Sequence, residues 1–206
     1  MDSEALAAAI QGAQRGNAVS FDLLVDQFSG RVFGFLYRLT GSRSDSEDLM
    51  QEVFVRLVRM IGAYQHDGRF EAWLFRIAAN LCRDRVRKAM RTPKHFSIDA
   101  GSDGEGESSA SALIPPAATD GADAGLIRRE DVDALGRALA ELPEAERMVI
   151  MLRHFSDMSF REIAESMGTP LGTALARAHR ALARLREIMG AGQDERPLSL
   201  ATEEDE

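Results

Sequence analysis

Apolar residues recur at steps of three and four along most of this chain, which is the spacing of one face of an α-helix. In the N-terminal half the pattern predicts a helix over 20–40, a second opened by a capping box at Ser44 and Glu47, and a third from Phe70. Gly41 and the polar stretch 62–69 separate them. The apolar faces comprise Phe21, Leu24, Phe28, Val32, Phe35 and Leu39; Leu49, Val53, Phe54, Leu57 and Ile61; and Trp73, Ile77 and Leu81.

The C-terminal half continues the same helical period. The spacing of Val132, Leu135, Leu139 and Leu142 predicts a helix that ends near Pro143, and residues 144–155 are predicted to form another. Nowhere does the chain alternate with the period of two that marks a half-buried strand. The sequence therefore predicts an all-α protein.

Near its end the chain carries the signals of two helices joined by a tight turn. Ser159 and Glu162 have the spacing of a capping box, and Gly168 can adopt the left-handed conformation that ends a helix. Thr169 suits the N-cap and Pro170 the first position of a second helix. This pattern is typical of a helix-turn-helix, which places its second helix in a DNA major groove. That helix has a series of apolar positions at Leu175, Ala178, Leu182, Leu185 and Met189.

Two helices have basic surfaces. Arg76, Asn80, Arg83 and Arg87 follow one another at steps of four, three and four, so they share a face. Arginines suit phosphates, and an asparagine can read a base edge. A basic face is also the ordinary solvated side of a helix. The helix after Gly168 carries a second set of basic residues, Arg177, Arg180 and Arg184.

Aromatic residues lie just before the first basic face. Tyr64, His66, Phe70 and Trp73 offer surfaces on which unstacked bases could pack. Trp73 also suits the apolar core, since it continues the stripe of Ile77.

Composition divides the chain into four parts. The 206 residues have a formal net charge of −8. Residues 97–125 contain six acidic side chains and neither lysine nor arginine, and residues 190–206 contain six acids and one arginine, so the remainder carries +3. We expect a helical domain over 1–95, a flexible acidic linker over 96–126, a second domain over 127–190 and an acidic tail over 191–206.

Other residue types argue against several classes of protein. The single cysteine, Cys82, allows no internal disulfide, and the four histidines have no metal-ligand spacing. We find no nucleophile–base constellation and no phosphate-binding loop, and we expect no catalytic residue, metal or cofactor. The chain shows neither a membrane span nor a signal peptide, so we expect a cytoplasmic protein.

Five segments together resemble the extracytoplasmic-function (ECF) group of bacterial sigma-70 family RNA polymerase sigma factors. The resemblance covers both predicted domains in the family's order. The segments are 21–38 (FDLLVDQFSGRVFGFLYR), 47–58 (EDLMQEVFVRLV), 70–87 (FEAWLFRIAANLCRDRVR), 138–152 (ALAELPEAERMVIML) and 159–186.

The resemblance implies a role for each surface. The first domain would bind the clamp helices of core RNA polymerase through Asp48, Leu49, Gln51, Glu52 and Phe54. The loop 62–69 would capture a flipped base, and the minus-10 promoter element would meet Phe70, Trp73, Arg76, Asn80, Arg83 and Arg87. The second domain would read the minus-35 element, near the polymerase flap, with Ser159, Arg161, Thr173, Ala176, Arg177, His179 and Arg180. The linker would run toward the RNA exit path, and an anti-sigma factor would be a further partner.

The chain departs from the family at Leu175 and Ala176, where polar side chains are usual. Reading of the minus-35 element could then depend on phosphates, on DNA shape and on apolar contact with thymine methyl groups. Alternatively, Leu175 belongs to the buried side of its helix.

Three functions remain open from the sequence. The leading one is a dissociable initiation subunit without catalysis of its own. A sigma mimic that titrates an anti-sigma factor keeps the fold, and a helix-turn-helix repressor that binds its operator without polymerase is the third. An enzyme is the least favoured class.

Overall fold

A computed structural model describes residues 1–91 and 134–194, and every regular element in these two ranges is a helix. The all-α prediction is therefore confirmed for the described residues. The predicted linker over 96–126 lies outside them, as do residues 195–206 of the predicted tail. The first domain contains α1 (Ser3–Gln14), α2 (Ala18–Thr40), α3 (Arg43–Met60), the 3-10 turn η1 (Ile61–Ala63) and α4 (Phe70–Arg91). The second contains a helical segment over 134–141, α6 (Glu144–Ser156), α7 (Phe160–Met167) and α8 (Leu171–Asp194).

Local signals set the ends of α2 and α3. Gly41 ends α2 in the left-handed conformation with φ of 69°, as its position predicts. The side chain of Ser42 caps α3 by accepting a hydrogen bond from the backbone N–H of Asp45 at 3.2 Å. The predicted capping box at Ser44 and Glu47 is therefore wrong, because Ser44 already lies inside the helix.

The helix α1 lies outside the sequence prediction. Asp2 caps it, and Ala9, Ile10 and Ala13 face the core against α2. The two helices approach closely at Gly12, where a Cβ atom would lie 2.0 Å from the hydroxyl oxygen of Ser20. Only glycine fits there without displacing α2.

The helix-turn-helix has the predicted start and turn. The backbone N–H of Ser159 donates to Glu162 Oε2 at 2.7 Å, and the Glu162 N–H donates to Ser159 Oγ at 3.3 Å, which completes the capping box. Gly168 ends α7 with φ of 62°. The predicted N-cap role of Thr169 is wrong, because its buried hydroxyl has no hydrogen-bond partner among the described residues. The carbonyl of Pro170 accepts the first helical hydrogen bonds of α8 instead.

The buried side of α8 differs from the predicted apolar series. Alanines and one leucine form the seam against α6 and α7, namely Ala174, Ala178, Ala181 and Leu185. Leu175 is 45% exposed, and Leu182 and Met189 are exposed as well. The seam is centred one position before the two leucines, at small residues that allow close helix contact. Leu175 is thus a surface residue, which decides between the two readings of this position.

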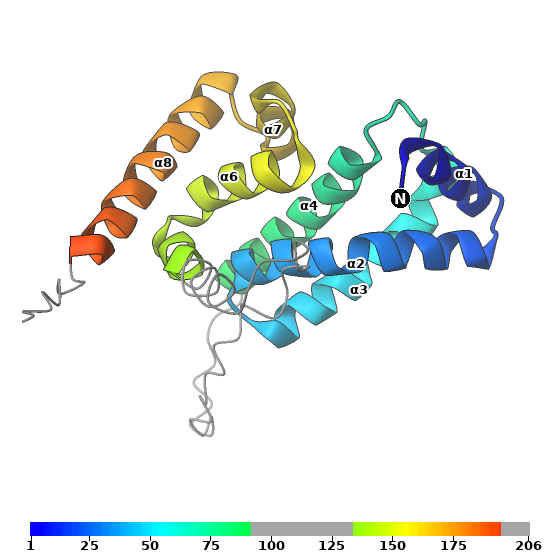
Figure 1. Cartoon of the computed structure of the whole chain (residues 1–206), viewed down its shortest axis with the longest axis horizontal. Coiled ribbons are helices and arrows are strands. Elements are labelled where there is room, and N and C mark those ends of the chain that lie inside the picture. The colour runs from blue at the N-terminus through cyan, green and yellow to red at the C-terminus, as the bar shows by residue number, and fades with distance from the viewer. Residues whose placement is uncertain (92–133, 195–206) are drawn as a thin grey trace, which may run out of the picture.

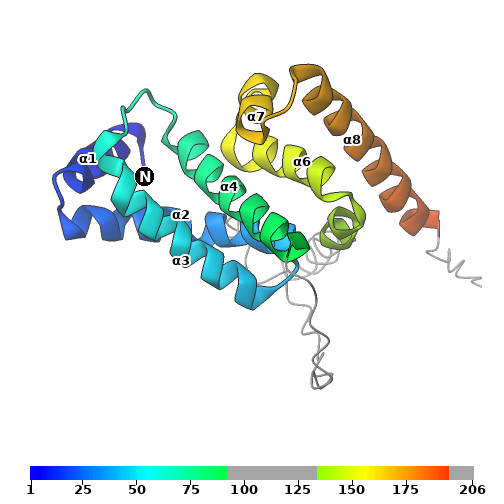
Figure 2. The ribbon, with the colours of Figure 1, turned by 180° about the vertical axis from the view of Figure 1, so that it is seen from behind.

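The two domains pack directly on each other. In both views α6 and α7 lie alongside α4 (Figure 1, Figure 2), and α6 also contacts α2. The apolar core is continuous across this contact, since Phe75 of α4 and Leu152 of α6 belong to one buried cluster. Within the described ranges, we find no helix that combines the length and apolar character needed to cross a membrane.

Candidate nucleic-acid interface

The helix α4 presents the predicted basic face. Arg76 and Arg87 are exposed, and Asn80 and Arg83 are half-buried. Arg83 donates one hydrogen bond to Asn80 Oδ1 at 2.8 Å and another to the carbonyl of Ser166 in α7 at 2.9 Å. The Asn80 amide is therefore held by its neighbouring arginine.

Phe70 does not belong to this face. Its side chain is 0% exposed and packs against Phe28 at a ring-centroid distance of 5.4 Å. Phe70 lies on the buried side of α4 together with Leu74, one helical turn further on. We therefore assign Phe70 to the core and do not propose it as a DNA contact.

A pair of aromatic rings in close, tilted contact lies beside the basic face. Tyr64 and Trp73 have centroids 4.6 Å apart at an interplanar angle of 30°. The Gln14 amide of α1 anchors the loop by donating to the carbonyls of Ile61 and Tyr64 at 3.1 and 2.6 Å. Burial, together with the negative charge of Asp67, raises the pKa of Tyr64 to about 12. The Tyr64 phenol thus stays neutral and can stack or donate a hydrogen bond.

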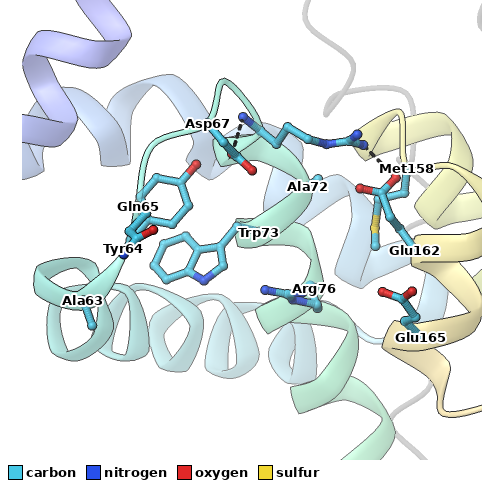
Figure 3. Close-up of a pocket in the computed structure, with 11 residues that line it drawn as sticks. Ala63, Tyr64, Gln65, Asp67, Ala72, Trp73, Arg76, Met158, Glu162 and Glu165 are labelled. Atoms are coloured by element: carbon cyan, nitrogen blue, oxygen red, sulfur yellow. Dashed lines mark hydrogen bonds and ion pairs between the residues drawn. The ribbon is translucent and has the colours of Figure 1, made fainter.

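A cavity of about 340 Å³ opens at these rings. Figure 3 shows Trp73 and Arg76 of α4 on one wall and Glu162 and Glu165 of α7 on the other. Arg69 crosses the rim, where its guanidinium lies 2.7 Å from Glu162 Oε2. The hydrogen bonds from Ser159 and the charge of Arg69 outweigh the effect of desolvation and lower the pKa of Glu162. The sequence did not single out Arg69, because its partner lies in the other domain.

The residues of α3 that were expected to bind polymerase differ in their exposure. Asp48, Gln51 and Glu52 are exposed, whereas Leu49 is 3% exposed and Phe54 is half-buried against the core. The position of Leu49 in the core overturns its expected role as a surface contact. Asp45 and Asp48 are ion-pair partners of Arg85 on α4.

Two apolar residues of α3 extend this surface. Val55 and Val58 are exposed and follow Gln51 at helical steps of four and three. The predicted set did not include them, although their spacing from Gln51 could have revealed them. Exposed valines on one face suit a protein partner better than DNA.

The second domain keeps part of its expected surface free. Ser159, Arg161, Ala176 and His179 are exposed, while Thr173 and Arg177 are half-buried. Arg177 and Arg83 line a second cavity, of about 200 Å³, between the domains. Arg180 donates from Nε to the buried Glu146 at 2.9 Å, and Arg184 donates to the other oxygen at 3.1 Å. The Arg180 guanidinium is thus oriented by α6 at the edge of the exposed face.

Comparison with known proteins gives the same division of the chain into two domains. The chain matches the family Sigma-70 region 2 over residues 24–92 and Sigma-70, region 4 over residues 133–185. It is 30% identical to the ECF RNA polymerase sigma factor SigW of Bacillus subtilis over 86% of this chain and 93% of that protein. It is 35% identical to the RNA polymerase sigma factor CarQ of Myxococcus xanthus, over 83% and 90%.

The fold also resembles a solved structure. The sigma factor RpoE of Bartonella quintana, in complex with the anti-sigma factor NepR, superposes with a TM-score of 0.59 at 24% identity, over 82% of this chain and 96% of that one. Two matched domains in the family's order, with relatives of similar length, identify the group. The chain belongs to the sigma-70 family of RNA polymerase sigma factors, in its ECF group.

Proposed function

We propose that this sigma factor holds core RNA polymerase with α3 and grips the promoter at two places, the minus-10 element with α4 and the minus-35 element with α8. It acts in the cytoplasm and performs no catalysis of its own, since polymerase carries out nucleotide addition. The observation that carries this proposal is the Tyr64–Trp73 ring pair, which adjoins the basic residues of α4.

The ring pair suits promoter opening. Extruding a base from duplex DNA costs a few kcal/mol. Stacking on an aromatic side chain returns about 1–3 kcal/mol per base, and Arg76 and Arg87 supply contacts to the backbone. A face of α4 that offers both a stacking surface and contacts to the backbone can hold the nontemplate strand away from its complementary strand.

On α3, the proposed polymerase surface consists of Asp48, Gln51 and Glu52 with the exposed valines Val55 and Val58. Mixed acidic and apolar character favours a protein partner with basic and apolar groups. On α8, the proposed minus-35 surface consists of Ala176, Arg177, His179 and Arg180, supported by Ser159, Arg161 and Thr173.

Run-off transcription tests the minus-10 assignment. Templates are taken from transcript starts mapped after overexpression, and the full chain is mixed with core polymerase. Trp73→Ala should reduce promoter opening about tenfold, because one base loses its stacking surface, and Arg87→Ala should reduce it as well. Arg15→Ala, an exposed arginine at the end of α1, is the matched control. If both variants opened the promoter as well as the wild type does, the assignment of the minus-10 contact to α4 would be refuted. An inactive wild-type chain would favour the sigma mimic.

We further propose that an anti-sigma factor holds this chain inactive before induction. The relative of similar fold from Bartonella quintana is bound to such a factor. A partner that co-purifies with the chain from uninduced cells should suppress run-off transcription when added back. A partner without that effect would count against this control.

A further inference from the structure

The helix α1 packs on the turn that leads from α3 into the aromatic loop. It contacts both α2 and η1, and it lies next to this turn in both views (Figure 1, Figure 2). The match to Sigma-70 region 2 begins at residue 24, after the end of α1. The family match therefore gives this helix no role, and its contacts have to be read from the structure.

One side chain of α1 holds the turn. Gln14, the last residue of the helix, is half-buried, and its amide nitrogen donates to the carbonyl of Ile61 at 3.1 Å and to the carbonyl of Tyr64 at 2.6 Å. Ile61 begins η1 and Tyr64 follows it, so the amide spans the whole turn. An amide nitrogen carries two N–H donors. Both donors of Gln14 are thus used on the loop.

The position of Gln14 is fixed by the packing of α1. Ile10 and Ala13 are 0% and 2% exposed and belong to the core of the first domain. The close approach of Gly12 to Ser20 leaves no room for α1 to move toward α2. A side chain carried by a well-packed helix can hold a loop in one geometry. Gln14 therefore ties the aromatic loop to the core.

The loop supplies one ring of the Tyr64–Trp73 pair. Trp73 is carried by α4, whereas the Tyr64 backbone is held by hydrogen bonds to Ile61 and Gln14. The Tyr64 ring lies 4.6 Å from Trp73 and 5.6 Å from Phe70, measured between ring centroids. The distance between the two rings of the pair thus depends on where Gln14 holds the loop.

We propose that Gln14 is a positioning residue for promoter opening: its amide keeps Tyr64 against Trp73, so that an extruded base meets a preformed stacking surface. This role rests on the function proposed above for α4 and its ring pair. Ordering a loop or a side chain during binding costs free energy, and a surface that is ordered beforehand avoids this cost. Gln14 acts through the two rings and needs no contact with DNA of its own.

Two variants of the full chain test the role of the amide. Gln14→Glu keeps the size of the side chain, but a carboxylate accepts hydrogen bonds and donates none. Gln14→Ala removes the group altogether. Gln11→Glu, at an exposed site on the same helix, makes the same change of charge and is the matched control. Trp73 is the only tryptophan of the chain, so its fluorescence reports on the ring pair in the free protein.

Both Gln14 variants should shift the Trp73 emission to longer wavelength and increase its quenching by acrylamide. They should reduce run-off transcription about threefold, less than the loss of the ring itself, because Trp73 still offers its own surface to the base. Binding to core polymerase should stay at the wild-type level. Gln11→Glu should leave the emission, the run-off and the binding unchanged.

A double variant separates positioning from a general structural effect. Gln14→Glu should cause no further loss of run-off in a Trp73→Ala chain, because the two residues act as one unit. A further threefold loss there would overturn the inference, as would wild-type run-off by the Gln14 variants or reduced run-off with unchanged Trp73 emission. Each of these results leaves the function of α4 standing if Trp73→Ala alone impairs run-off. Wild-type run-off by Trp73→Ala would instead remove the stacking role of the ring pair, and the role of Gln14 with it.

Discussion

Arg180 of α8 donates a hydrogen bond from Nε to Glu146, a carboxylate of α6 that is 6% exposed. Glu146 also pairs with Arg184, so one buried acid fixes two arginines of α8. The acid belongs to the segment 138–152 that resembles the family, and its contacts tie α8 to α6.

Replacing Glu146 by glutamine should lower the free energy of unfolding by about 1–2 kcal/mol, since two charge-assisted hydrogen bonds are weakened while both arginines stay hydrated. It should also weaken minus-35 binding, because Arg180 loses its orientation. Urea denaturation and holoenzyme binding measure the two effects. Glu187→Gln, on the exposed side of α8, is the control, and equal stability of the two variants would contradict the role of Glu146.

Leu49 and Asp48 should separate stability from polymerase binding. Leu49→Ala creates a cavity in the first domain and should cost about 2–5 kcal/mol. Asp48→Ala should change the free energy of unfolding by less than about 0.5 kcal/mol. It should nevertheless weaken the binding of the chain to core polymerase. Denaturant titration and a core-binding assay give the two values. A stable Leu49→Ala with impaired polymerase binding would return Leu49 to the interface.

Several local signals could be read from the sequence, although the capping box at Ser44 and Glu47 and the N-cap at Thr169 were wrong. Gly41, Gly168 and the Ser159–Glu162 box act within one turn of chain, so their types and spacing suffice. Periodicity already placed Leu49 on the apolar face of its helix, and its expected surface role came only from the resemblance. The exposure of Leu175 depends on which face of α8 packs on its neighbours, which periodicity does not reveal. The Arg69–Glu162 pair joins residues 93 positions apart, beyond the reach of any spacing rule.

The helix α1 was missed for a different reason. Its buried residues include alanines at positions 9 and 13, and small side chains give little contrast between an inner and an outer face. The amide of Gln14, which anchors the aromatic loop, was missed with it. The rings and arginines of the candidate site could be predicted, but not the contacts that hold them.

The Cys82 thiol should be unreactive in the folded protein. It is 2% exposed, and burial raises its pKa to about 11. At about pH 8 very little thiolate forms, and reagents lack access to it. Labelling with a thiol-specific dye should therefore follow global unfolding in urea. Rapid labelling without denaturant would contradict the burial.

Acid should weaken the contact between Arg69 and Glu162. The pKa of Glu162 is lowered from its ordinary value of 4.5, so the carboxylate contributes stability above that value and loses it as the pH falls through the folded pKa. Small-angle scattering measured below about pH 4.5 should report more extended chains. Glu162→Gln should remove the Glu162 contribution to this pH dependence. If Glu162→Gln kept the pH dependence of the wild type, that dependence would come from other acidic residues.

Leu175 should read a thymine methyl group if α8 binds the minus-35 element. Replacing thymidine by deoxyuridine in that element removes one methyl per base, worth about 0.8 kcal/mol or roughly fourfold in affinity. The wild-type holoenzyme should show this loss and Leu175→Ala should not. Equal losses in both proteins would place Leu175 away from the bases.

The buried alanines of α8 set the distance between this helix and the helices on which it packs. Ala174, Ala178 and Ala181 bury only methyl groups between α8 and the helices α6 and α7, so the size of these side chains sets how α8 packs on its neighbours. Enlarging one of them, as in Ala178→Val, should shift α8 relative to α6 and α7 while leaving its exposed side chains unchanged. If α8 binds the minus-35 element as proposed, a change in this seam would alter promoter choice through the orientation of α8 rather than through the side chains that meet DNA.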